Sequence, residues 1–186
     1  MRDITKDDRL FCMFVCADDN VKCNRIVCYL YVFQEMGFNL GFRYKVGNGG
    51  ISSRDVDNYM NELLGSGLLS MKNHTLSAEI SLDEVFLEYP LDYQDLCALE
   101  LILQALRSLD DEDLRFMCLT NLVTHNVHEK VSFSDYSASR EMIVNILKSQ
   151  STVYSDENFD ASLKVMNLLR EYRDNLDNED RQLVLA

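Results

Sequence analysis

The order of apolar stripes and glycine breaks between residues 22 and 80 constrains this fold more than any other feature of the sequence. Residues 22–36 carry apolar side chains at spacings of three and four, which predicts a helix that ends at Gly37. An extended-looking stretch follows over residues 38–46. The run Gly47–Gly50, Gly-Asn-Gly-Gly in sequence, then predicts a loop.

A second helix is predicted over residues 52–64, where Ser52 or Ser53 can cap the first turn. Its apolar stripe consists of Val56, Tyr59, Met60, Leu63 and Leu64. Two short strands are expected next, over residues 68–71 and 75–80, with a turn between them. Helix, linker, helix, strand, turn and strand is the element order of a winged helix, so the N-terminal part is predicted to be winged-helix-like.

The second half of the chain is predicted to be helical. Four segments repeat apolar residues with the helical period, and they span residues 93–109, 114–125, 136–148 and 159–176. The predicted fold is therefore mainly α, with a winged-helix-like module and a small β wing packed on a C-terminal helical bundle. The module is placed at residues 1–82 and the bundle at residues 83–186, although the length also fits one continuous domain.

The chain is acidic and its charge is uneven. Its 186 residues include 18 basic and 31 acidic side chains, a net charge of −13, which excludes a basic, histone-like binder of nucleic acid. Residues 21–78 hold six basic and four acidic side chains, so the rest of the chain carries −15. In the predicted 52–64 helix, Arg54 is outnumbered by Asp55, Asp57 and Glu62, and this excess of carboxylates predicts weak or absent binding of duplex DNA.

The sequence predicts a soluble, cytoplasmic protein, because no apolar run approaches a membrane span and no signal peptide follows the acidic start. Its six cysteines are then expected to be reduced. Cys12, Cys16, Cys23 and Cys28 lie in apolar helical sequence without the spacing of zinc knuckles, so they are predicted to be free thiols, with a zinc site as the alternative.

No catalytic constellation is recognisable, and the protein is predicted not to be an enzyme. Its three histidines, His74, His125 and His128, lie outside any nucleophile motif. His125 and His128 are three residues apart and could share a metal ion, but a polar helix end is the favoured interpretation, and no metal or cofactor is predicted. The run Gly47–Gly50 lacks the lysine of a phosphate-binding loop.

Three stretches carry a resemblance to known proteins: the apolar residues 25–33, the segment Phe38–Tyr44, and the Leu-Leu-Gly-Ser-Gly-Leu-Leu turn at Leu63–Leu69. Over about residues 20–72 the chain resembles the YwgA-like proteins and, more distantly, the Panacea (SocA-like) antitoxins. Those families usually carry a proline in the loop before the second helix, where this chain has Gly47–Ile51. The resemblance implies a helix-rich, winged-helix-like protein that binds another protein, such as a toxin or a mobile-element factor.

The predicted function is non-enzymatic binding of a protein partner by a bacterial regulator, antitoxin-like or associated with phage defence or mobile elements. One alternative is an acidic inhibitor that mimics nucleic acid, and a second is a winged-helix transcription regulator. The predicted partner-binding residues are Tyr44, Arg54 and Tyr59, where the glycine loop meets the 52–64 helix. Tyr59 also belongs to the apolar stripe, so a core role competes with an interface role. No membrane partner is predicted, and the sequence leaves the oligomeric state open.

Overall fold

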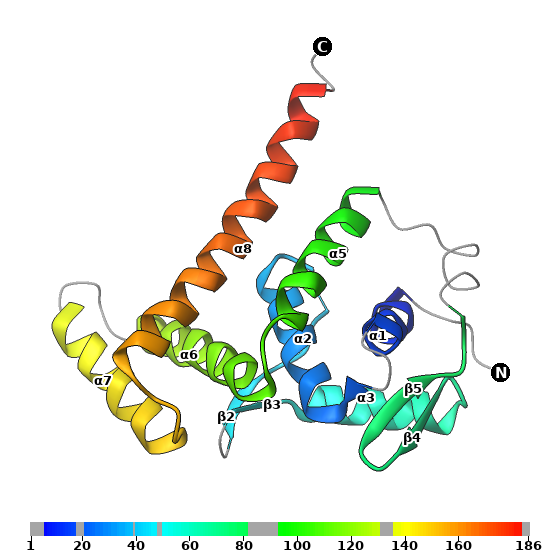
Figure 1. The fold of residues 1–186 in the computed structure, drawn as a ribbon, viewed down its shortest axis with the longest axis horizontal. Coiled ribbons are helices and arrows are strands. Elements are labelled where there is room, and N and C mark those ends of the chain that lie inside the picture. Colours follow the sequence, from blue (N-terminus) through cyan, green and yellow to red (C-terminus); the bar gives the residue numbers. More distant parts are fainter. Residues whose placement is uncertain are drawn as a thin grey trace. The chain divides into compact units, whose positions relative to one another are not determined.

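A computed structural model of the chain describes residues 6–17, 21–38, 40–47, 50–81, 93–130 and 136–183. The chain divides into two compact units. Unit 1 consists of Met1–Arg43 and Ser53–Leu109, and unit 2 consists of Tyr44–Ser52 and Asp110–Ala186. Figure 1 shows the helices and strands of both units and labels most of them.

Unit 1 has the arrangement of a winged helix. Its elements are α1 (Lys6–Ala17), β1 (Val21–Lys22), α2 (Cys23–Glu35), α3 (Arg54–Gly65), β4 (Leu69–Lys72), β5 (Thr75–Ala78) and α5 (Tyr93–Arg107). The three strands form an antiparallel sheet in the order β1, β5, β4, so the strand that comes last in the sequence lies in the centre. The β4–β5 hairpin, which we call the wing, follows α3 directly (Figure 1).

Burial distinguishes the two helices that lead to the wing. α2 is buried over eight consecutive residues, Ile26–Phe33, so it forms part of the core on all sides. α3 is buried at Val56, Met60 and Leu63, which recur at helical spacing on one face. The Ser53 hydroxyl accepts a hydrogen bond from the Val56 backbone N–H at 3.2 Å and caps the start of α3.

Two turns with positive φ angles connect α3 to the wing and close the wing itself. Gly67, with φ +76°, follows α3, and the next backbone N–H, of Leu68, donates to the Leu63 carbonyl at 3.1 Å. At the tip of the wing, Asn73 and His74 have φ angles of 52° and 61°. Two such residues suit the turn that a twisted two-residue hairpin requires, so the wing is short and sharply closed.

Arg25 joins α2 to the end of α5 within unit 1. Its Nη2 donates to the carbonyls of Leu106 and Leu109, each at 2.9 Å, and its Nε donates to the Tyr29 hydroxyl at 2.7 Å. Leu106 lies in the last turn of α5 and Leu109 lies just beyond it, so one guanidinium binds two carbonyls where this helix ends. α5 therefore belongs with the winged-helix elements.

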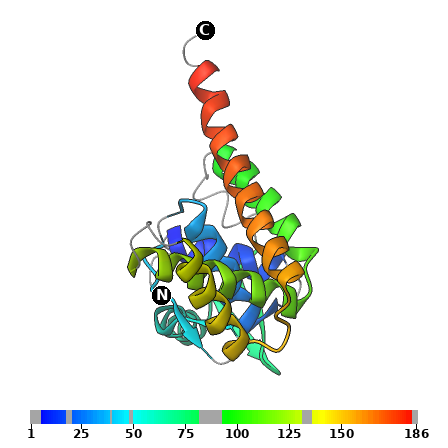
Figure 2. The same ribbon diagram turned by 90° about the vertical axis from the view of Figure 1, so that its left-hand side faces the viewer.

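Unit 2 consists of a short hairpin and three helices. Its elements are β2 (Lys45–Gly47), β3 (Gly50–Ser52), α6 (Asp111–Lys130), α7 (Tyr136–Gln150) and α8 (Asp156–Leu183). The strands β2 and β3 pair antiparallel and contact α6, which also contacts α7 and α8. α8 continues past the ends of α6 and α7 (Figures 1 and 2).

The three helices of unit 2 share one apolar cluster. Its buried members are Phe116, Leu119, Val123, Val127, Ile143, Leu147 and Phe159. Val46 and Ile51 of the hairpin pack against this cluster. Gly50 allows the close approach, since a Cβ atom there would lie 3.2 Å from the Arg115 Nε.

The mainly α fold with a small β wing, predicted from the sequence, is confirmed. The predicted boundary at residues 82 and 83 lies outside the described residues. The division of the chain differs from the predicted one in two places: the helix at 93–107 belongs to unit 1, and residues 44–52 belong to unit 2. Within the described part of the chain, no helix combines the length and the apolar composition needed to cross a membrane.

Candidate interaction surface

The solvent-facing side of α3 is a continuous polar stripe. Its members are all exposed and recur at spacings of three and four: Arg54, Asp57, Asn58, Asn61 and Glu62. We call this set the α3 stripe. It lies on the side of the helix opposite the buried face, because helical spacing brings positions three and four apart onto one surface. In a winged helix, the corresponding surface of this helix is the one used for recognition.

Asp55 borders the α3 stripe but is already bound by Arg43. Its Oδ2 accepts hydrogen bonds from the Arg43 backbone N–H at 3.0 Å and from Nε at 3.1 Å, and its Oδ1 accepts from Nη2 at 3.3 Å. These hydrogen bonds hold the pKa of the Asp55 carboxyl below its ordinary value. Arg43 is therefore committed to Asp55, and the stripe carries one cation, Arg54, against two carboxylates.

Asp55 is expected to titrate at a lower pH than an ordinary aspartate. Because Arg43 favours the charged form, the contribution of this pair to stability is complete above the unfolded pKa of about 3.9 and is lost as the pH falls through the lower folded-state pKa. An NMR titration of the side-chain carboxyl measures this. In Arg43→Gln the pKa should rise toward its ordinary value; an unchanged pKa would show that Arg43 is not the cause.

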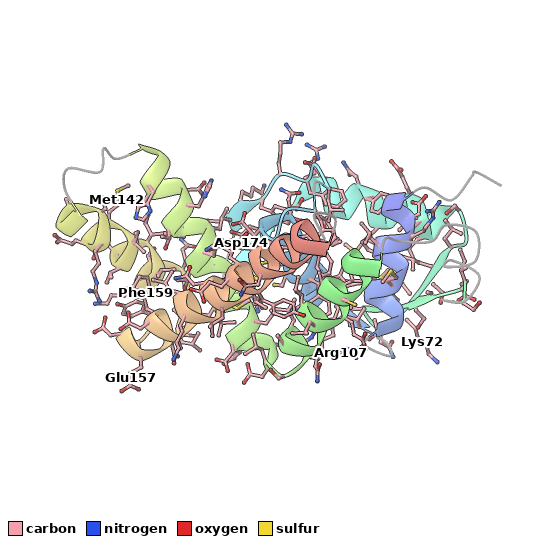
Figure 3. All side chains as sticks on the ribbon, turned by 90° about the horizontal axis from the view of Figure 1, so that it is seen from above. Lys72, Arg107, Met142, Glu157, Phe159 and Asp174 are labelled. Atoms are coloured by element: carbon pink, nitrogen blue, oxygen red, sulfur yellow. The ribbon has the colours of Figure 1, made fainter. Side chains whose placement is uncertain are left out.

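The wing adds a second exposed segment to unit 1, and its first strand, β4, contacts α3. Met71 is 53% exposed, and Lys72, Asn73 and His74 at the tip are exposed as well (Figure 3 labels Lys72). Near the tip of the wing, the Cys23 thiol donates to the His74 carbonyl at 3.3 Å. Burial raises the pKa of this thiol, so it is protonated at neutral pH.

The three predicted partner-binding residues have different surroundings. Arg54 is exposed at the first position of α3, whereas Tyr44 is half-buried and belongs to unit 2. The Tyr59 ring packs edge-on against Phe11 with centroids 5.4 Å apart, and it lies 5.7 Å from the Phe42 ring. Its hydroxyl donates to Asp8 Oδ1 at 2.6 Å. These contacts give Tyr59 a packing role in unit 1, and an interface role for the three residues stays a prediction.

The sequence analysis did not name Asn58 and Asn61, and it used Asp57 and Glu62 only as an argument against DNA binding, so four members of the α3 stripe were not predicted to bind a partner. The signal was present in the same helical spacing that identified the apolar stripe, because the polar residues of this segment occupy the opposite side of the helix. Reading both faces of the predicted helix, and not the apolar one only, would have found them.

The cysteines and histidines of the described residues do not converge. No group of three or more His, Cys, Asp or Glu side chains there is placed to hold a metal ion. Within the described part of the chain, Cys23 and Cys28 are not joined in disulfides, and the side chains of Cys12 and Cys16 lie outside the described residues. His125 and His128 are both exposed toward the end of α6.

Comparison of the chain with protein-family models, with curated proteins and with solved structures finds no match. The resemblance to YwgA-like proteins and Panacea antitoxins therefore stays a prediction.

Proposed function

We propose that the protein is a non-enzymatic regulator that binds a protein partner through the α3 stripe. The observation that carries the proposal is the composition of this stripe, in which two carboxylates and two carboxamides outnumber the single guanidinium of Arg54. The amides of Asn58 and Asn61 each offer two N–H donors and a carbonyl acceptor, which suits the mixed polar groups of a protein surface. Carboxylates at Asp57 and Glu62 favour cationic side chains on the partner.

A winged-helix transcription regulator is a competing function, and the winged-helix strand order of unit 1 supports it. The net negative charge of the α3 stripe argues against it. Proteins that bind duplex DNA neutralise its phosphates with Lys and Arg. On the exposed face of α3, the carboxylates of Asp57 and Glu62 would instead repel the phosphates. The remaining cations near α3 do not change this balance, because Arg43 is bound to Asp55 and the wing adds one lysine, Lys72.

The resemblance to antitoxins supplies the setting of the proposal: regulation of a toxin or of a mobile-element factor in the bacterial cytoplasm. An acidic mimic of nucleic acid is the other alternative, and exposed carboxylates of α8 favour it. They are Asp156, Glu157, Asp160, Glu171 and Asp174. A mimic would present these groups to the basic surface of a nucleic-acid-binding protein. The α3 stripe would then be dispensable, which separates the two functions experimentally.

Duplex DNA is expected to bind weakly or not at all. Selection from a pool of random duplex sequences, followed by fluorescence titration at about 0.1 M salt, is the measurement, since specific DNA binders reach dissociation constants of roughly 10 nM or tighter under such conditions. We expect no selected sequence to approach this affinity. Sequence-specific binding in that range, lost in Arg54→Ala, would make the protein a transcription regulator instead.

A further inference from the structure

A small cavity lies among the three helices of unit 2, with a volume of about 110 Å³. Its apolar side is formed by Ile143, Phe159 and Leu163, and its polar side by Thr124, His128, Arg140 and Asp160. Phe159, on the first turns of α8, is labelled in Figure 3. Because Ile143 and Phe159 are 3% and 5% exposed, the apolar wall is part of the unit's core and keeps its shape.

Three polar groups that line this cavity, those of Thr124, Arg140 and Asp160, do not pair with one another within the described part of the chain. Thr124 Oγ1 is buried and forms no hydrogen bond within the described part of the chain. A buried hydroxyl is stabilised when it pairs with a hydrogen-bonding group. A ligand in the cavity could therefore form a hydrogen bond with this hydroxyl.

Arg140 and Asp160 line the same cavity from α7 and α8, yet they form no ion pair among the described residues. The Arg140 guanidinium instead lies over the Phe159 ring, 5.9 Å from its centroid. Both side chains are exposed, so their charged groups remain accessible to solvent and to a ligand. A cation and an anion therefore border one small cavity without neutralising each other.

We infer that this cavity binds a small zwitterion of the α-amino-acid class. A ligand carboxylate would accept hydrogen bonds from the Arg140 guanidinium, the donor geometry best suited to it. The ligand ammonium would pair with Asp160, Thr124 Oγ1 would gain a hydrogen-bond partner, and a short aliphatic side chain would contact the apolar wall. At about 110 Å³ the cavity is small, which favours a short side chain such as that of alanine over an aromatic one.

This site is independent of the proposed function, because it belongs to unit 2 and uses no residue of the α3 stripe. The test is an NMR titration of the full-length protein with L-alanine, with propionate and ethylamine as probes that each lack one of the two charges. We expect L-alanine to cause saturable shifts at Thr124, Ile143 and Leu163. Propionate, ethylamine and L-phenylalanine should bind at least tenfold more weakly.

Two exposed substitutions identify the charged partners without disturbing the core. Arg140→Gln and Asp160→Asn should each weaken L-alanine binding at least tenfold. Arg107→Gln and Asp174→Asn, which remove the same charges elsewhere, should leave it unchanged; both control positions are labelled in Figure 3. Absence of saturable shifts, equal affinity for the singly charged probes, or unchanged binding in the Arg140 and Asp160 variants would each overturn the inference.

Discussion

Replacing Tyr59 by alanine is expected to lower the free energy of unfolding by about 3 kcal/mol, the low end for loss of a large aromatic ring from a packed site. The ring contacts Phe11 of α1 and Phe42 in the segment between α2 and α3, so its removal opens a gap where three parts of unit 1 meet. The substitution also removes the hydrogen bond from the tyrosine hydroxyl to the carboxylate of Asp8, a residue that is 0% exposed. Urea denaturation measures the change.

Two further substitutions divide this effect into its parts. Tyr59→Phe keeps the ring and removes the hydrogen bond, so it should cost about 1.5 kcal/mol, the lower end for a hydrogen bond to a charged group. Asn58→Ala, at the neighbouring exposed position, should change stability by no more than about 0.5 kcal/mol. If Tyr59→Ala costs less than about 1 kcal/mol and still abolishes partner binding, Tyr59 is an interface residue and the packing account is wrong.

The element order of unit 1 could be predicted from the sequence because each signal is local. Apolar residues at helical spacing mark α2 and α3, Ser53 marks a cap, and glycines mark the ends. The wing was predicted for the same reason, as two short apolar runs separated by a turn. These features depend on residues within about one or two helical turns of each other, so one sequence is enough to reveal them.

The grouping of elements could not be predicted, because it depends on contacts between distant residues. The hairpin at residues 44–52 contacts α6, which begins at Asp111. The sequence Gly47–Gly50 does not predict this contact. Likewise, Arg25 bonds to carbonyls of Leu106 and Leu109, more than 80 positions away. A half-buried guanidinium that binds carbonyls at the end of a distant helix has no sequence signature, because backbone carbonyls exist at every position.

Of the two candidate sites, one could be predicted from local sequence and the other could not. The α3 stripe follows from helical spacing and was accessible from the sequence, once the polar face of the helix is considered. The cavity of unit 2 was not, because its walls come from three helices and its charged groups, Arg140 and Asp160, lie 20 positions apart. Tyr59 was predicted to bind a partner, and the structure gives it a packing role. The sequence could not show that Phe11 and Phe42 contact its ring, because these contacts join separate parts of the chain.

Quantitative affinity capture with matched variants measures whether the α3 stripe binds a protein. Asn58→Arg combined with Asn61→Arg places two long cationic side chains on the stripe. The control, Asn145→Arg combined with Asn175→Arg, makes the same changes at exposed positions of α7 and α8. Both variants should melt as the wild type does, since all four asparagines are exposed.

We expect at least one protein to be captured from the native host equally by the wild type and the control, and at least tenfold less by the stripe variant. Added bulk and positive charge at the centre of an interface prevent close contact and repel the cationic groups that Asp57 and Glu62 attract. Mass spectrometry of the captured proteins measures the difference. Capture of the same proteins in equal amounts by all three forms would contradict the account, and selective loss in the α7 and α8 variant would place the interface on the acidic helices of unit 2.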